Sequence, residues 1–189
     1  MKKSYHHGEL RSALLEAARA RLRADPARDL SLRELARDAG VSPHAPYRHF
    51  ETKAALHHAI AALGYRELAG MAELAARSGQ PLDRLAEGYL RAGREEPTLL
   101  RLVSEARIDP GQESSDLALA RDEWFAALVA LLESAGARGA TAELYRRAGM
   151  LWATLVGVTQ IRIHGAAGLL PDDLQPDVAT MAKAVAGVR

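Results

Sequence analysis

The sequence predicts an all-α protein, because three properties of the chain favour helices over strands. Alanine, leucine, arginine and glutamate dominate its 189 residues, and all four have high helix propensity. Aromatic residues amount to only 5%, and no segment gathers enough valine, isoleucine and threonine to indicate a sheet. Apolar residues recur at helical spacing between Gly, Pro and Ser turn signals. We expect about nine helices.

The first expected helix covers the stretch LRSALLEAARARL. Ser31 followed by Glu34 predicts a capping box at the start of a second helix. Gly40 ends this second helix, because glycine enters the left-handed conformation without steric cost. Ser42 and Pro43 then supply an N-cap and a first helical residue, so a third helix is expected from about Pro43. The residues expected to face the core from the second helix are Leu32, Leu35, Ala36 and Ala39.

Two short helices joined by a glycine turn are the layout of a helix-turn-helix unit, whose second helix reads the major groove of DNA. Phe50 is expected to anchor the end of the third helix inward. Thr52 is expected to cap a fourth helix that has Lys53 in its first turn, where free amides and a cation can meet a phosphate. Tyr47 and Lys53 are the expected phosphate contacts, and His44 and Ala45, with Arg33 or Arg48, are placed for base edges. The complete set of expected DNA-binding residues is Arg33, Ser42, Pro43, His44, Ala45, Tyr47, Arg48, His49 and Lys53.

The distribution of charge along the chain agrees with DNA binding at this end. Residues 1–53 hold 11 Lys and Arg against 7 Asp and Glu, a balance of +4. The rest of the chain holds 14 against 17, a balance of −3. Although the net charge of the chain is only +1, its positive charge is concentrated in the predicted helix-turn-helix unit.

The remaining chain is expected to fold into further helices separated by turn signals. A long helix should connect the helix-turn-helix unit to the rest of the protein, and an Asp-Pro-Gly sequence indicates a loop over residues 108–114. The expected helices cover residues 53–77, 82–95, 97 onward, 115–135, 141–164 and 172–188.

The helix expected over residues 141–164 is apolar nearly all round, so it must be covered on two faces. Its own domain can cover one face, and a second subunit is the economical candidate for the other. Gly149, Ala153 and Gly157 would allow another helix to approach closely. Together with the last helix, this helix could form a four-helix interface across a two-fold axis, so we expect a homodimer. One face carries Leu144, Ala148, Leu151, Leu155, Val158 and Arg162, and the other carries Met150, Trp152, Ala153, Val156, Gly157 and Gln160.

Large side chains on the middle helices are candidates for a ligand cavity, although side chains of this kind more often belong to an ordinary core. Gln160 is a polar group that could orient a ligand. His57 and His58 do not indicate a metal, because adjacent residues on a helix point about 100° apart. The expected ligand-binding residues are Met71, Tyr89, Trp124, Met150, Trp152 and Gln160.

Composition limits the remaining possibilities. A hydrophobic content of 48% supports a packed globule. The chain has no cysteine, which excludes a disulfide framework and a thiolate metal site and suits the cytoplasm. No apolar run is long enough to span a membrane. We therefore expect a cytoplasmic protein without membrane contact, cofactor or metal.

One combination of residues consists of Leu35-Ala36, Gly40-Val41-Ser42, Tyr47, His49-Phe50 and Lys53, with Tyr5-His6-His7-Gly8 and LRSALLEAARARL ahead of them. This combination resembles the tetracycline-repressor (TetR/AcrR) family of transcriptional regulators. The resemblance implies a DNA-binding domain over residues 1–52 and a larger helical domain over residues 53–189, which dimerises and holds a small-molecule effector. It also implies a repressor that binds a palindromic double-stranded DNA operator as a homodimer and is released by the effector.

The C-terminal half is similar to one subgroup of these regulators. The stretches PTLLRL from Pro97 and WATLVG from Trp152 resemble a ligand domain with a Trp-His-Gly signature. Val156 stands where that signature has histidine. No ligand role of that histidine can therefore be carried over.

Two other classes of function make different predictions. The chain contains none of the patterns Gly-x-Gly-x-x-Gly, Gly-x-x-x-x-Gly-Lys-Ser/Thr, His-Glu-x-x-His and Gly-x-Ser-x-Gly, so we do not expect an enzyme. A helical protein-binding adaptor without DNA or small-molecule function is the alternative. It would explain the helices but not the outward set of Tyr47, His49 and Lys53 beside a capped turn.

Overall fold

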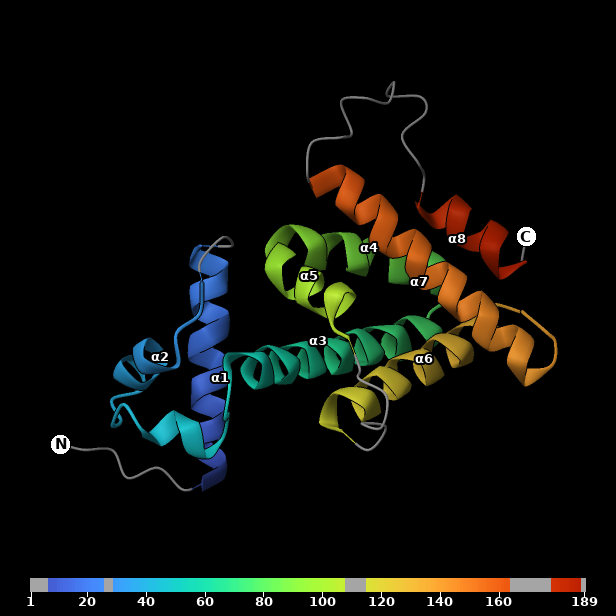
Figure 1. Cartoon of the computed structure of the whole chain (residues 1–189). Coiled ribbons are helices and arrows are strands. Elements are labelled where there is room, and N and C mark those ends of the chain that lie inside the picture. The colour runs from blue at the N-terminus through green and yellow to red at the C-terminus, as the bar shows by residue number, and fades with distance from the viewer. Residues whose placement is uncertain (1–6, 26–28, 108–114, 164–177, 188–189) are drawn as a thin grey trace.

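The computed structural model describes residues 7–25, 29–107, 115–163 and 178–187, and these residues fold into helices (Figure 1). The described residues contain eight α-helices and one short 3-10 helix, and no strand lies among them. The all-α prediction is therefore confirmed. In chain order the elements are α1 (His7–Ala24), α2 (Leu32–Asp38), η1 (Ala45–Arg48), α3 (Lys53–Ala76), α4 (Pro81–Glu95), α5 (Pro97–Glu105), α6 (Asp116–Ser134), α7 (Thr141–Ile163) and α8 (Val178–Ala186).

Buried side chains form two hydrophobic cores. The smaller core joins α1, α2 and the first turns of α3 in an N-terminal unit. From there α3 runs into the larger core, where α4, α5 and α6 pack against it (Figure 1). Leu99 of α5 belongs to the smaller core, whereas Leu100 and Val103 of the same helix belong to the larger one. The domain boundary between residues 52 and 53 stays a prediction.

Several helices begin where the sequence predicts. Thr52 caps α3, and its hydroxyl oxygen accepts a hydrogen bond from the Ala55 amide at 3.1 Å. Ser115 caps α6 in the same way. Pro81 and Pro97 lie in the first turns of α4 and α5, where the missing amide hydrogen removes no intrahelical bond.

The capping box predicted at Ser31 and Glu34 is wrong. Ser31 has the extended backbone of an N-cap, but its side chain makes no capping hydrogen bond. The Glu34 carboxylate instead accepts a hydrogen bond from Arg21 of α1 at 2.9 Å. A guanidinium on a neighbouring helix offers the carboxylate a charge-assisted bond, which is stronger than a bond to a backbone amide.

The third helix is shorter than predicted. It was expected from about Pro43, but the structure has a single 3-10 turn over Ala45–Arg48. The amides of Ala45 and His49 each bond the carbonyl three residues earlier, at 3.0 and 2.9 Å. Pro46 has no amide hydrogen to donate to the Ser42 carbonyl, so the first bond of the predicted α-helix cannot form.

The packing of α5 against α3 depends on Gly64. A Cβ atom at this position would lie 2.5 Å from Cγ2 of Val103 and 3.1 Å from Cδ1 of Leu99, both on α5. The neighbouring Tyr65 hydroxyl donates a hydrogen bond to the Val103 carbonyl at 3.0 Å. Burial raises the pKa of Tyr65 to about 12, so this hydroxyl keeps its proton.

The helices α7 and α8 pack together along one side of the larger core (Figure 1). The outward face of α7 is open in the single chain, with Tyr145 44% and Met150 57% exposed. Of the two faces of α7, the buried one carries Leu144, Ala148, Leu151, Leu155 and Val158.

None of the described helices is both long enough and apolar enough to cross a membrane. The predictions for Tyr5 and His6, for the 108–114 loop and for a helix start at residue 172 lie outside the described residues.

Candidate functional site

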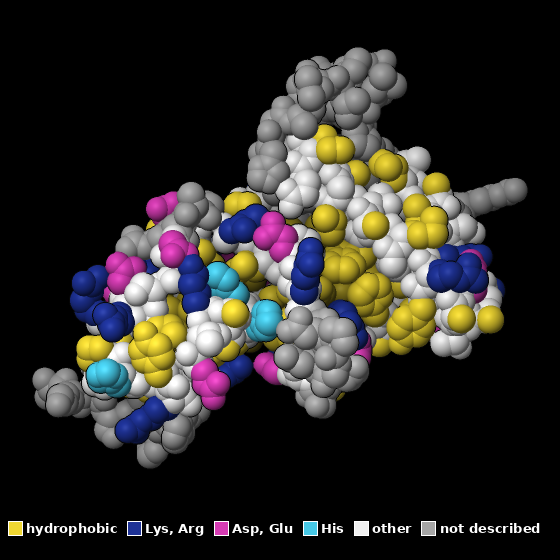
Figure 2. Space-filling model, viewed as in Figure 1, with side chains coloured by type: hydrophobic (Ala, Val, Ile, Leu, Met, Phe, Trp, Pro, Cys, Tyr) yellow, Lys and Arg dark blue, Asp and Glu magenta, His cyan; other side chains and the backbone are white. Residues whose placement is uncertain are grey.

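The candidate DNA-binding surface is formed by α2, η1 and the first turn of α3. Between α2 and η1, Gly40 has a φ of 68°, the left-handed conformation that glycine allows at a helix end. Phe50 is 2% exposed and Pro46 is buried, so both hold η1 against the smaller core. In Figure 2, Lys and Arg side chains, a histidine and an exposed hydrophobic patch share the face of the N-terminal unit at the left.

Most of the predicted DNA-binding residues lie open on this surface. Tyr47 has 43% of its surface exposed. Arg33, His44 and Arg48 form no ion pair with any described residue. Side chains that are neither packed in the core nor held in an ion pair can contact a nucleic acid. The exposed members of the set are Arg33, Ser42, Pro43, His44, Tyr47 and Arg48, and the half-buried ones are Ala45, His49 and Lys53.

Lys53 has a partner that sequence reasoning missed. Its Nζ forms an ion pair with Asp29, from the segment just before α2. The Asp29 side chain is 85% exposed, so this pair lies in water, where ion pairs add little to stability. Contact with a phosphate therefore requires Lys53 to exchange one partner for another, at small energetic cost.

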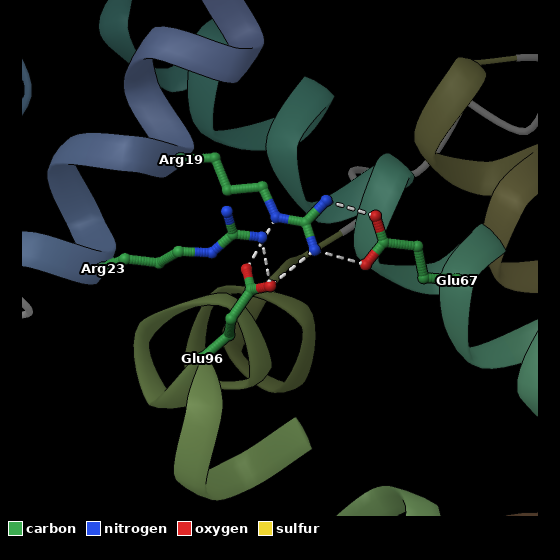
Figure 3. Close-up of polar contacts among 4 residues, drawn as sticks. All are labelled: Arg19, Arg23, Glu67 and Glu96. Atoms are coloured by element: carbon green, nitrogen blue, oxygen red, sulfur yellow. Dashed lines mark hydrogen bonds and ion pairs between the residues drawn. The ribbon is translucent and has the colours of Figure 1, made fainter. Parts of the chain in front are cut away.

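An ion cluster joins α1, α3 and the corner between α4 and α5 (Figure 3). Arg19 of α1 donates to both Glu96 oxygens, at 2.6 and 2.7 Å, and to Glu67 of α3 at 2.7 Å. Arg23 also donates to Glu96, at 2.6 Å. Only 16% of the Arg19 side chain and 15% of the Glu96 side chain are exposed. These four residues, Arg19, Arg23, Glu67 and Glu96, are termed the inter-helix ion cluster below.

Both central members of the inter-helix ion cluster are held in their charged forms. Burial alone would raise the pKa of Glu96, but the hydrogen bonds from Arg19 and Arg23 outweigh burial, and the pKa is lowered. The pKa of Arg19 is raised, chiefly by its hydrogen bond to Glu96. No sequence signal could have found the cluster, because Arg19 and Glu96 are 77 residues apart.

A small cavity lies in the larger core between α4, α5 and α7. Its volume is about 10 Å³, which is room for a single water molecule. None of the side chains that line it carries a charge. The lining residues are Tyr89, Pro97, Leu100, Ser104, Val156, Thr159 and Gln160.

Two polar groups at or near this cavity have no hydrogen-bond partner. Thr159 is 4% exposed, and its Oγ1 atom makes no hydrogen bond. The Nε1 atom of Trp152 has none either, and its ring packs against Tyr65 and Phe125 at centroid distances of 5.9 and 5.5 Å. Burial raises the pKa of Tyr89 to about 12, and the nearby Trp152 indole opposes this rise without reaching hydrogen-bond geometry. Unpartnered buried polar groups are uncommon, so these groups mark a place where a ligand could supply the missing bonds.

The structure separates the predicted ligand-binding residues into two groups. Tyr89 and Gln160 line the cavity, and Trp152 lies close to Tyr89. The others lie elsewhere: Trp124 is fully buried in the larger core, Met150 is on the outward face of α7, and Met71 lines an open groove of about 450 Å³ between α3 and α4. The described residues contain no cluster of three His, Cys, Asp or Glu side chains that could hold a metal ion.

Both halves of the chain are similar to known protein families. A model of bacterial regulatory proteins of the tetR family matches residues 14–60. A model of the tetracyclin repressor-like C-terminal domain matches residues 82–185, more than half of the chain. No curated protein matches the chain.

Solved structures share this fold over nearly the whole chain. A protein with unknown function from Rhodococcus sp. RHA1 is 29% identical, with a TM-score of 0.70 over 99% of this chain and 96% of that one. A TetR family transcription regulator from Marinobacter aquaeolei VT8 is 19% identical, with a TM-score of 0.59 over 93% and 94%. The SmeT–triclosan complex is 24% identical, with a TM-score of 0.51 over 93% and 90%. The last two likenesses show the fold alone.

The unpartnered hydroxyl beside the cavity generates a stability prediction. Thr159→Val should raise the free energy of unfolding by about 1 kcal/mol, because it removes a buried polar group that has no partner. Thr98 is the matched control, since it is also 4% exposed but has a polar interaction, so Thr98→Val should destabilise the protein. Denaturant unfolding of the two variants measures both effects. A loss of stability in Thr159→Val would show instead that the hydroxyl is hydrogen-bonded, for example to a water molecule in the cavity.

Proposed function

The chain belongs to the tetracycline-repressor family of DNA-binding transcription regulators, and from this premise we propose that it is a cytoplasmic repressor controlled by a small molecule. In this proposal it binds a palindromic operator as a homodimer and leaves the DNA when the effector binds. The observation that carries the proposal is the open set of cationic, histidine and tyrosine side chains around η1. A purely protein-binding role would leave this set unexplained, and the proposal contains no catalytic step.

The proposed DNA contacts are of two kinds: contacts to phosphates, which position the protein on the duplex, and contacts to bases, which recognise the sequence. Tyr47 on η1 and Lys53 at the start of α3 would contact phosphates, which fix the register of the protein on the duplex. His44 and Ala45 at the start of η1, with Arg33 on α2 or Arg48 on η1, would meet base edges in the major groove. Two such surfaces in a dimer require half-sites roughly 34 to 36 Å apart, or a multiple of this distance.

Lys53→Ala tests the phosphate contact. The variant should bind all DNA sequences more weakly by a similar factor, and the slope of log affinity against log salt should become shallower by about 0.9, the contribution of one phosphate. Lys183→Ala is the matched control, because Lys183 also forms a single ion pair, with Asp83, and its side chain is 41% exposed against 42% for Lys53. The measurement is fluorescence anisotropy on a duplex that the wild-type protein selects from a random-sequence library.

The same experiment decides the assignment of roles. A changed sequence preference in Lys53→Ala, with the salt slope intact, would make Lys53 a base contact. Arg33→Ala should instead relax the preference at one position of each half-site, with a loss of about 1 to 3 kcal/mol for the preferred base. Failure of the wild-type protein to select any sequence would contradict the proposed function.

The proposed dimer interface is the outward face of α7 together with α8. Three of the large hydrophobic side chains exposed on the described residues lie there: Tyr145, Met150 and Met181. A Cβ atom at Gly157, on the same helix, would meet no atom within 4 Å, so the surface is open at this point. An apolar helix face of this kind is typical of a site that a second subunit covers.

Met150→Glu tests this interface. The charge should be buried against the second subunit without a partner, so the variant should become monomeric at micromolar concentration. Leu74→Glu is the control, since Leu74 is a still more exposed hydrophobic residue on α3 and this variant should stay dimeric. Light scattering gives the mass of each variant. A monomeric wild-type protein, or a dimeric Met150→Glu variant, would contradict the interface.

The proposed effector site is the cavity bordered by Tyr89 and Gln160, with Trp152 close to Tyr89. Its lining is mostly apolar, carries no charged side chain and has an unpartnered hydroxyl at Thr159. Such a site suits a small uncharged molecule that is largely apolar and has at least one hydrogen-bonding group. Triclosan, found with the structural neighbour SmeT, is a suitable first compound for a thermal-shift screen.

Trp152→Ala and Tyr89→Ala test the effector site with whichever compound the screen identifies. Both variants should keep their affinity for the selected duplex and need more compound to release it, because they remove contacts to the bound molecule. Tyr145→Ala is the control, since Tyr145 is an exposed aromatic residue on the outward face of α7. Unchanged release in both cavity variants would place the effector elsewhere.

A further inference from the structure

The helix α5 forms one wall of the cavity and also touches the N-terminal unit. Leu99, on its other face, packs in the smaller core. Glu96 lies directly before α5, as the only residue between α4 and α5, and its carboxylate binds Arg19 and Arg23 of α1. A single short helix therefore connects the cavity to α1. The residues of α5 that line the cavity are Pro97, Leu100 and Ser104.

A movement of α5 would change the cavity and the inter-helix ion cluster together. At about 10 Å³ the cavity has no room for an organic molecule, so a molecule of that size can enter only if a wall moves. If α5 is that wall, its displacement carries Glu96 with it, because no linker separates the two. The short hydrogen bonds between Glu96 and the two arginines would then break.

A displacement of α1 would reach the DNA-binding surface. Arg21, between the two cluster arginines on α1, donates to Glu34 and to Asp38 of α2, each at 2.9 Å. Arg11 lies over the Phe50 ring, 5.7 Å from its centroid, next to η1. The elements that carry the proposed DNA contacts are thus attached to α1 at two places.

We propose that the inter-helix ion cluster is the contact through which an occupied cavity releases DNA. The inference rests on the proposed function, because it concerns how an effector would control DNA binding. The arrangement with the cavity closed and the cluster formed is the DNA-binding form. An entering molecule displaces α5, Glu96 leaves Arg19 and Arg23, and α1 no longer holds the DNA-binding surface in place.

Glu96→Gln tests the proposal without an effector. Loss of the carboxylate charge weakens the bonds to both arginines, so the variant should bind the selected duplex about tenfold more weakly, within the usual range of coupling between sites. Removing a negative charge by itself would strengthen DNA binding, so the expected direction is opposite to a general charge effect. Asp83→Asn is the matched control, because it removes the same charge from an ion pair, with Lys183, that does not involve α1. It should change the affinity less than twofold.

Gly64→Ala is an independent way to displace α5. The added Cβ would lie 2.5 Å from Cγ2 of Val103 and 3.1 Å from Cδ1 of Leu99, so these side chains must shift, and we expect α5 to move away from α3 with them even when the cavity is empty. The variant should therefore also weaken binding to the selected duplex. Gly70→Ala, in the same helix but with no atom within 4 Å of the added Cβ, should leave the affinity unchanged.

The double variant Glu96→Gln/Gly64→Ala decides whether the two changes act through one contact. Its affinity for the selected duplex should equal that of whichever single variant binds DNA more weakly, because both changes break the same connection between α5 and α1. Wild-type affinity in a folded Glu96→Gln variant, or effects that multiply in the double variant, would overturn the proposal. If Gly64→Ala does not fold, as judged by circular dichroism, the comparison of Glu96→Gln with Asp83→Asn is decisive alone. A wild-type protein that binds no DNA contradicts the proposed function itself, which is a different outcome.

Discussion

The close approach of other helices to α3 is the constraint on which the rest of the structure depends. Small residues are frequent on the buried face of this helix, and Gly64 permits its close contact with α5. The helix also belongs to both cores, through Leu56 and Ile60 at one end and Leu68 and Ala72 further along. A continuous helix therefore fixes the distance between the two cores, and α5 packs against it where they meet. Tight packing of this kind transmits displacement, because it has no free volume in which to absorb it.

Helix boundaries followed well from the sequence, because capping groups act within one turn of the chain. Thr52 and Ser115 cap their own helices, and no distant residue competes with them. Ser31 and Glu34 have the residue types and spacing of a capping box, but the Glu34 carboxylate binds Arg21 on α1 instead. The failure of that prediction therefore comes from tertiary contact, which a local pattern does not contain.

The same distinction separates the two parts of the candidate site. The exposure of most residues of the candidate DNA-binding surface was predictable, because they come from one continuous segment between Arg33 and Lys53, whose turn chemistry fixes which side chains point outward. The cavity draws its lining from three helices, and residues such as Ser104 and Thr159 have no pattern that marks them. Pairing across 77 residues, as between Arg19 and Glu96, is likewise decided by packing. The open groove at Met71 shows that residue size and helix position alone do not place a side chain in a cavity.

The positions of the two tryptophans determine what optical spectroscopy can report on this protein. The chain has only Trp124 and Trp152, and both pack in the larger core. Trp124 is fully buried, whereas Trp152 packs against Tyr65 and Phe125 close to Tyr89. Intrinsic fluorescence therefore senses the polarity and quenching around the cavity, without any label. The N-terminal unit contains no tryptophan, so its unfolding does not change this signal. Because the chain has no cysteine, a single cysteine introduced into this unit could be labelled with a thiol-reactive dye without competing sites.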